Sequence, residues 1–195
     1  MKKTVFMMLA FFCTMFAVNA MNTKTEGDLK CLKGQEFVNV KFTYNNMTVG
    51  KMTEQAYVDK KVSEYNQKEA GKGDNWFTMW EGDKNSVYPA SFCDLMDKHS
   101  KVKTSKNEQA YTVEVNTDFF EPGFNIGIAK QNAFISVTIK IYANANPEKV
   151  LATVTITKAP GRTVGGNDYQ VSDRVSEAYA KAGKEFAKIL TKAVK

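Results

Sequence analysis

The chain has 195 residues, of which 43% are hydrophobic and 25% charged, and this suits one globular domain with a sizeable core. The formal net charge is +6, but lysine supplies nearly all of the positive charge, and only Arg162 and Arg174 are arginines. Because arginine is the usual residue for reading guanine and gripping phosphate, this composition argues against a nucleic acid partner.

Residues 1–20 have the pattern of a secretory signal peptide. Lys2 and Lys3 precede an uncharged apolar run that ends at Val18, and Val18-Asn19-Ala20 offers a site for signal peptidase. The run is too short for a membrane-spanning helix, which needs ~20 apolar residues. We therefore expect cleavage before Met21, and the loss of two lysines lowers the net charge from +6 to +4. No later stretch is apolar enough to cross a bilayer.

Two cysteines, Cys31 and Cys93, remain after this cleavage. In an oxidising compartment such a pair can form a disulfide, and closing so long a loop would stabilise the fold by about 4 kcal/mol. The alternative is two separate thiols, with Cys93 buried in a helix. The sequence leaves both open, because it does not give the separation of the Cα atoms.

Residues 21–34 are polar, and we expect them to form a flexible N-terminal segment before a single domain at 35–195. A half-buried strand is predicted at 36–44, where Val38, Val40 and Phe42 alternate with other residues. A helix is predicted at 53–66, with Thr53 as its cap. A second helix is predicted from Pro89 onward, since proline suits a first helical turn.

The second half of the chain returns to the period of a strand. Alternating apolar residues predict strands at 111–116, 134–143 and 150–157, and the last two read as an antiparallel hairpin joined by the loop NANPEK. Residues 173–195 predict a long amphipathic helix capped by Ser172 or Asp173. This order of elements predicts an α+β fold: a two-layer α/β sandwich with one mixed, mostly antiparallel sheet and helices packed on one face.

Most catalytic and cofactor motifs are absent from the sequence. The stretch APGRTVGGND (159–168) lacks the lysine of a phosphate-binding loop, so it predicts a turn. His99 is the only histidine, which excludes a histidine-rich metal site. Asp118 and Glu121 are a carboxylate pair of the kind that glycoside hydrolases use, yet most secreted domains contain such a pair. We therefore assign no catalytic, cofactor-binding or metal residue, and we expect no cofactor and no enzyme.

An aromatic cluster at residues 76–88 is the most prominent candidate surface. Trp76, Phe77, Trp80 and Tyr88 could stack on sugar rings or grip a protein partner if they were exposed. The alternative is that these rings close one end of the core, and the usual burial of tryptophan favours it.

Four segments carry a resemblance to known proteins: VNVKFTY, YPASF, FISVTIKIYANANPEKVLATVTI and SEAYAKAGKEFAKIL. They are similar to small exported Bacteroidetes proteins of unknown function. Those proteins resemble in architecture the N-terminal domain of TolB and the periplasmic domain of curli-secretion lipoproteins. The resemblance implies an α/β sandwich that works by association in the cell envelope. The chain departs from the lipoproteins, because Phe11-Phe12 before Cys13 does not supply the small residues of a lipobox.

These observations predict an exported protein of the periplasm or the extracellular space. The first hypothesis is a non-enzymatic cell-envelope module that binds an envelope protein or a second copy of itself. The alternative is a domain that binds a glycan or a small amphiphile through the aromatic cluster. A third hypothesis is a glycoside hydrolase-like enzyme that uses Asp118 and Glu121.

Overall fold

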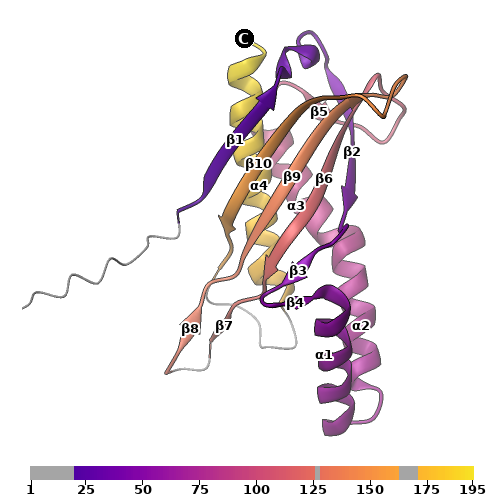
Figure 1. Cartoon of the computed structure of the whole chain (residues 1–195), viewed down its shortest axis with the longest axis vertical. Helices are drawn as coiled ribbons and strands as arrows, with labels where there is room; N and C mark the ends of the chain where they lie inside the picture. The colour runs from indigo at the N-terminus through magenta and orange to yellow at the C-terminus, as the bar shows by residue number, and fades with distance from the viewer. Residues whose placement is uncertain (1–19, 126–127, 163–170) are drawn as a thin grey trace, which may run out of the picture.

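The computed structural model describes residues 20–125, 128–162 and 171–195, so the expected signal peptide lies outside the described residues. Within these ranges the chain is an α+β two-layer sandwich, with one eight-stranded sheet and helices packed on one of its faces (Figure 1). This confirms the fold class predicted from the sequence. No helix in the described ranges is both long enough and apolar enough to span a membrane.

The elements follow in chain order. The strands are β1 Asn22–Gly27, β2 Phe37–Thr43, β3 Thr48–Val49, β4 Met52–Thr53, β5 Lys103–Thr104, β6 Tyr111–Glu121, β7 Phe124–Asn125, β8 Lys130–Gln131, β9 Phe134–Ala143 and β10 Val150–Pro160. The helices are the 3₁₀ helix η1 Leu29–Leu32, α1 Glu54–Lys68, α2 Lys72–Gly82, the π-helix η2 Asp83–Val87, α3 Tyr88–His99 and α4 Ser172–Ala193.

The main sheet has the strand order β1-β10-β9-β6-β2-β5. The β1–β10, β10–β9 and β9–β6 pairs are antiparallel, whereas β2 lies parallel to both β6 and β5. The predicted hairpin is confirmed, because β9 and β10 pair directly. The short strand β3 extends the sheet beside β6, and the β3–β4 turn leads into α1.

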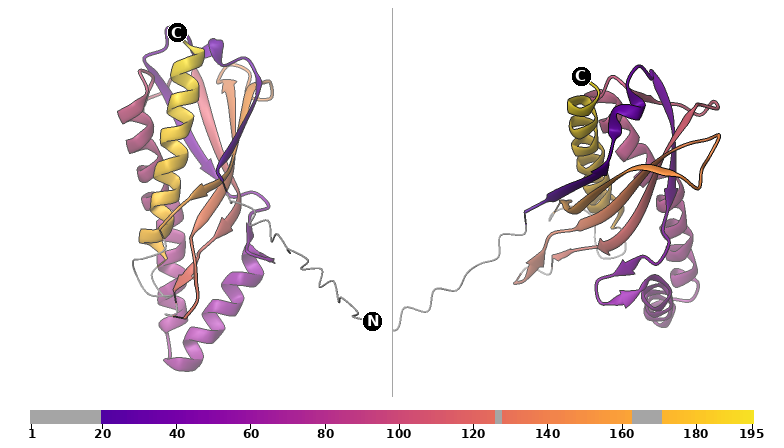
Figure 2. Two further views of the ribbon diagram at one scale, coloured as in Figure 1. Left: turned by 90° about the vertical axis from the view of Figure 1, so that its left-hand side faces the viewer. Right: turned by 45° about the horizontal axis from the view of Figure 1, so that its top comes forward.

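The core lies between the sheet and the pair of helices α3 and α4, which the left view of Figure 2 shows next to each other on one side of the sheet. Ile135, Val137 and Ile139 of β9 are fully buried, as their alternation predicts. Burial of each such side chain stabilises the fold by roughly 1.5–3 kcal/mol. From α4, Tyr179 and Phe186 belong to the same core cluster.

The opposite face of the sheet is polar. Glu114 of β6 lies between Lys41 of β2, whose Nζ atom is 3.2 Å from its carboxylate, and Lys140 of β9, its partner in register. Beside Lys140 the sheet continues with Thr153 of β10. A sheet with one face in the core and one face in water explains why each long strand alternates so regularly.

The N-terminal segment differs from the prediction. Residues 22–27, expected to be flexible, form β1, and all six of them pair with β10. The helix η1 follows, and its residues Leu29 and Leu32 are buried. The sequence gives little signal for β1, because all six of its residues are exposed and none carries an apolar pattern. The ordered domain therefore begins before residue 35.

The final helix is confirmed, but its predicted cap is not. Val171 occupies the N-cap position of α4, and no side chain caps the helix there. The preceding glycine-rich turn falls largely on residues 163–170, which lie outside the described residues. Gly161, at its start, donates its backbone N–H to the carbonyl of Ala133 at 2.7 Å.

Helices α3 and α4 approach each other closely at Gly183. A Cβ atom at this position would lie 2.1 Å from the carbonyl oxygen of Phe92. A glycine inside a helix is otherwise unfavourable, since it costs ~1 kcal/mol relative to alanine. The absent side chain lets the two backbones touch, and this brings the buried faces of α3 and α4 together over the sheet.

We predict that Gly183→Ala destabilises the protein by about 1–3 kcal/mol, because the new methyl group forces α3 and α4 apart. Gly82→Ala is the matched control. Gly82 also lies at a helical position, and a Cβ atom there would meet no atom within 4 Å. It should leave stability unchanged or raise it by up to ~1 kcal/mol. Urea unfolding followed by circular dichroism measures both, and equal effects of the two changes would contradict the close packing.

Candidate functional site

The connection between α2 and α3 is the most unusual segment of the described chain. Residues Asp83–Val87 wind as a π-helix, and the backbone runs without a break from α2 through η2 into α3. Short π-helical segments occur frequently at functional sites, because the wider turn redirects side chains. Here the turn directs Lys84 inward, while Asp83 and Ser86 line a groove on the surface.

Lys84 is the buried centre of an ionic cluster whose two carboxylates are partly exposed. Its Nζ atom lies 2.5 Å from Oε1 of Glu54 at the start of α1 and 2.9 Å from Oε1 of Glu81 in α2. The indole N–H of Trp80 donates to the same Glu54 oxygen at 2.9 Å. Burial alone lowers the pKa of Lys84, but the hydrogen bonds to Glu54 and Glu81 outweigh it and raise the pKa above 10.5. The cluster ties α1 to α2 and to η2.

Three tyrosines extend this cluster into the core. The hydroxyl of Tyr44 donates to the Lys84 carbonyl at 2.7 Å, and the hydroxyl of Tyr179 lies 2.7 Å from Oγ1 of Thr117. The ring of Tyr88 stacks on that of Tyr179, with centroids 4.8 Å apart. Burial raises the pKa of all three phenols above their ordinary value of 10. These groups stay neutral and serve packing.

Tyr88 differs from the other two tyrosines in its hydroxyl group. Its ring is fully buried, and among the described residues the hydroxyl has no hydrogen-bond partner. An unsatisfied buried hydroxyl reduces stability, because the group has given up its hydrogen bonds to water.

The predicted aromatic surface is mostly core. Trp76 and Trp80 are 2% exposed and Tyr88 is fully buried, whereas Phe77 is 42% exposed. Trp76 stacks on Trp80 at 5.4 Å, and Trp80 contacts Phe120 at 5.0 Å. The four rings therefore do not form a continuous exposed platform for a sugar. The face of the helix that carries Trp76 and Trp80 points into the molecule.

Helix α2 nevertheless carries the exposed apolar side chains Phe77 and Met79, and Val87 follows in η2. Two grooves of about 400 Å³ flank it. The α1–α2 groove is lined by Val58, Val62 and Phe77, with Asp59 and Asp74 beside them. The α2–α4 groove is lined by Met79, Asp83, Ser86, Ser172 and Asp173. Figure 1 shows that α1 and α2 form a hairpin that extends past the end of the sheet.

Both grooves combine an apolar surface with carboxylates. In the α2–α4 groove, burial raises the pKa of Asp83, a hydrogen bond from Ser172 lowers it, and the nearby charge of Asp173 raises it again, so that the pKa lies above 3.8. This local negative charge contrasts with the positive charge of the whole chain. The grooves can therefore accept apolar side chains that are flanked by lysine or arginine.

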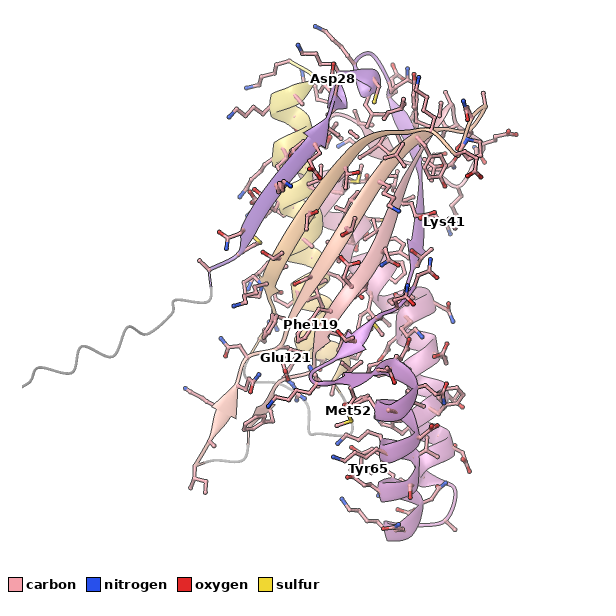
Figure 3. The ribbon with its side chains drawn as sticks, viewed as in Figure 1. Asp28, Lys41, Met52, Tyr65, Phe119 and Glu121 are labelled. Atoms are coloured by element: carbon pink, nitrogen blue, oxygen red, sulfur yellow. The ribbon has the colours of Figure 1, made fainter. Side chains whose placement is uncertain are left out.

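The carboxylate pair Asp118 and Glu121 is engaged within the sheet. Asp118 accepts hydrogen bonds from Thr138 at 2.7 Å and from Asn116 at 2.8 Å. Glu121, labelled in Figure 3 at the lower end of the sheet, accepts from the backbone N–H of Gly123 at 3.1 Å. Burial raises the pKa of Glu121. Each carboxylate thus has a structural partner that explains its presence.

The disulfide that the sequence permits is not formed, because Cys31 and Cys93 are both free thiols. Cys31 lies in η1, which contacts β10 and α4, whereas Cys93 lies in α3 and lines a cavity with Val40 and Phe42 of β2. Burial raises the pKa of Cys93 to about 12, and burial together with Asp28 raises that of Cys31. Neither thiol is activated as a nucleophile. The described residues contain no group of three side chains that could hold a metal ion.

No protein-family model and no curated protein matches the chain. Among solved structures, it is similar to a PelC dodecamer from Paraburkholderia phytofirmans, with 10% identity and a TM-score of 0.42 over 85% of this chain and 96% of that one. A point variant of the same PelC gives 9% identity and a TM-score of 0.40, over 83% and 96%. At this level of identity the likeness assigns no role to any residue.

We predict that Tyr88→Phe leaves stability at neutral pH unchanged or raises it by about 1 kcal/mol, because it removes a hydroxyl that has no partner among the described residues. Tyr179→Phe is the matched comparison. It should cost about 1–2 kcal/mol, since it leaves the buried Thr117 hydroxyl without its partner. Urea unfolding of both variants measures the difference. A larger loss for Tyr88→Phe than for Tyr179→Phe would contradict the hydrogen bonding described here.

The same phenols predict how stability changes with pH. Their pKa values in the folded state lie above the unfolded value of 10. Their contribution to the free energy of unfolding is therefore complete below pH 10 and is lost as the pH rises above it. The raised pKa of Lys84 acts in the same direction above 10.5. We expect the free energy of unfolding to fall between pH 10 and 12, and to fall less steeply in Tyr88→Phe. A profile that is flat in this range would show that the phenols are accessible to water.

Proposed function

We propose that the protein is a non-enzymatic, exported module of the cell envelope that binds a protein partner through the two grooves beside α2. The signal-like residues 1–20 support export, and the resemblance to envelope domains agrees with this location. The observation that carries the binding role is the α1–α2 hairpin. It extends past the sheet and exposes Phe77 and Met79 beside grooves of about 400 Å³.

The packing of the hairpin supports this role. On its inner side Trp76 and Trp80 are buried, and Lys84 forms an ion pair with Glu54. These contacts hold the hairpin in place, so that its outer side chains are presented on a rigid support. Apolar side chains that remain exposed on such a support are typical of protein interfaces, where aromatic residues and methionine are enriched.

The charges of the grooves indicate the kind of partner. Asp59 and Asp74 flank the apolar part of the α1–α2 groove, and Asp83 and Asp173 occupy the α2–α4 groove. A segment with apolar anchors and neighbouring lysine or arginine residues would match both features. The partner is thus a basic, amphipathic segment of another envelope protein.

Site-specific photo-crosslinking in cells tests this role. A photoreactive phenylalanine analogue at position 77 or 79 should yield one discrete crosslinked partner. The matched control is Val150, which is 44% exposed but lies at the start of β10, far along the chain from the hairpin. Crosslinking of equal yield and identical pattern at position 150 would contradict the proposal, as would the absence of any product at both hairpin positions.

A charge reversal tests the partner's chemistry separately. Asp59→Lys should reduce the crosslink from position 77 by about tenfold, because a basic partner is then repelled. Glu148→Lys is the control, since Glu148 is an exposed acid in the β9–β10 loop. An undiminished crosslink in Asp59→Lys, with circular dichroism confirming the fold, would show that the partner is not basic.

A further inference from the structure

Strand β1 is an open edge of the sheet. It pairs with β10 on one side, and no other strand of residues 20–125, 128–162 and 171–195 pairs with it on the other. All six of its residues are exposed, and Figure 1 shows β1 running along the border of the molecule. Helix α4 packs on β10 and β9, so β1 lies at the margin of the helical layer. An edge of this kind offers free N–H and C=O groups to another strand.

The charges of β1 have no partner on the neighbouring strand. Lys24 and Glu26 lie on the outer face, opposite Thr155 and Thr153 of β10. Among the residues that the structure describes, they pair only with each other, at 2.9 Å, and their side chains are 71% and 61% exposed. A pair this exposed contributes little to stability, because water screens it. Charged side chains on an edge strand hinder its pairing with other strands. Only a strand whose charges offset those of Lys24 and Glu26 can therefore add to this edge.

The arrangement is self-complementary across a twofold axis. When two copies of β1 pair antiparallel around an axis perpendicular to the sheet, residues on the same face oppose each other. In one such register the axis passes beside residue 24. Lys24 then lies opposite Lys24 of the other copy, and the two charges repel each other. The neighbouring register sets Thr25 against Thr25, and it places each Lys24 directly opposite a Glu26.

The favourable register also accommodates the other residues of β1. It sets Thr23 opposite Gly27, where the absent side chain leaves room for the threonine methyl group. Gly27 has a φ of +80°, and a Cβ atom there would lie 2.3 Å from the carbonyl oxygen of Leu151, so glycine is required by the fold of each copy. Threonine pairs such as Thr25 with Thr25 are favourable between strands.

We propose that β1 is a homodimerisation edge, where a second copy of this chain adds its own β1 antiparallel in the register that pairs Lys24 with Glu26. Two sheets then continue into one, with the helices of both copies on the same side. This surface is separate from the grooves beside α2, since no residue of β1 lines either groove. The two proposals can therefore fail independently.

Charge swapping tests the register in the protein purified from cells that express the full chain. Sedimentation equilibrium should show a concentration-dependent dimer. Lys24→Glu places four carboxylates at the edge and should weaken dimerisation by about tenfold. The double change Lys24→Glu with Glu26→Lys restores both cross-strand pairs and should restore the dimer. A monomer at all concentrations, or a dimer that Lys24→Glu leaves unchanged, overturns the proposal.

Oxidative crosslinking tests the axis itself, in a Cys31→Ser background that removes the nearest native thiol. Thr25→Cys should form a disulfide-linked dimer, because residue 25 faces itself across the axis. Thr23→Cys is the matched control on the same face of β1. It should give a several-fold lower yield of disulfide-linked dimer than Thr25→Cys, because residue 23 lies opposite Gly27 of the other copy. Equal yields overturn the register. If Thr25→Cys instead forms a mixed disulfide in cells with a protein of different mass, β1 accepts a foreign strand and the proposal is wrong.

Discussion

The placement of the α1–α2 hairpin depends on one buried ammonium group. Lys84 lies in the π-helix η2 and bonds to Glu54 at the beginning of α1 and to Glu81 near the end of α2. Removing a carboxylate takes a counter-charge from the buried ammonium group. The cost is below the roughly 3–5 kcal/mol of a fully buried pair, because the side chains of Glu54 and Glu81 are 22% and 40% exposed and water screens them. Because Glu54 is the first residue of α1, this cluster sets the direction in which the hairpin leaves the sheet. Trp80 strengthens the same contact, since its indole bonds to the Glu54 carboxylate.

The interior beside this cluster is filled by packed aromatic side chains. The tyrosines and tryptophans that might serve chemistry elsewhere are buried, and burial keeps the phenols neutral. The thiols of Cys31 and Cys93 are similarly held in their protonated form. The two surfaces proposed for binding, the outer side of the α1–α2 hairpin and the edge strand β1, are exposed. The two surfaces share no residue, because the hairpin extends past one end of the sheet and β1 forms one of its edges (Figure 1).

The candidate site could be predicted only in part. The aromatic residues at 76–88 were recognisable from the sequence, and the usual burial of tryptophan favoured the core for them. Which ring remains outside could not be predicted, because Phe77 and Trp76 are neighbours that differ only in the direction in which α2 points them. The π-helix had no signal either. Its residues, Asp83 to Val87, are ordinary helix and turn residues, and one of the two carboxylates that Lys84 contacts lies in the distant helix α1.

The sequence by itself determined the long strands β2, β6, β9 and β10, the helices α1, α3 and α4, and the sandwich they form. Alternation and helical periodicity are local consequences of burying one side of each element. The N-terminal pattern likewise indicates export without reference to the fold. Only the tertiary structure decided what depends on contacts between distant residues. The polar strand β1 exists because β10 offers it an edge, and α3 can touch α4 because Gly183 meets the backbone of Phe92. Contacts of this kind produce no sequence periodicity in either segment, so they cannot be predicted from the residue pattern of one segment alone.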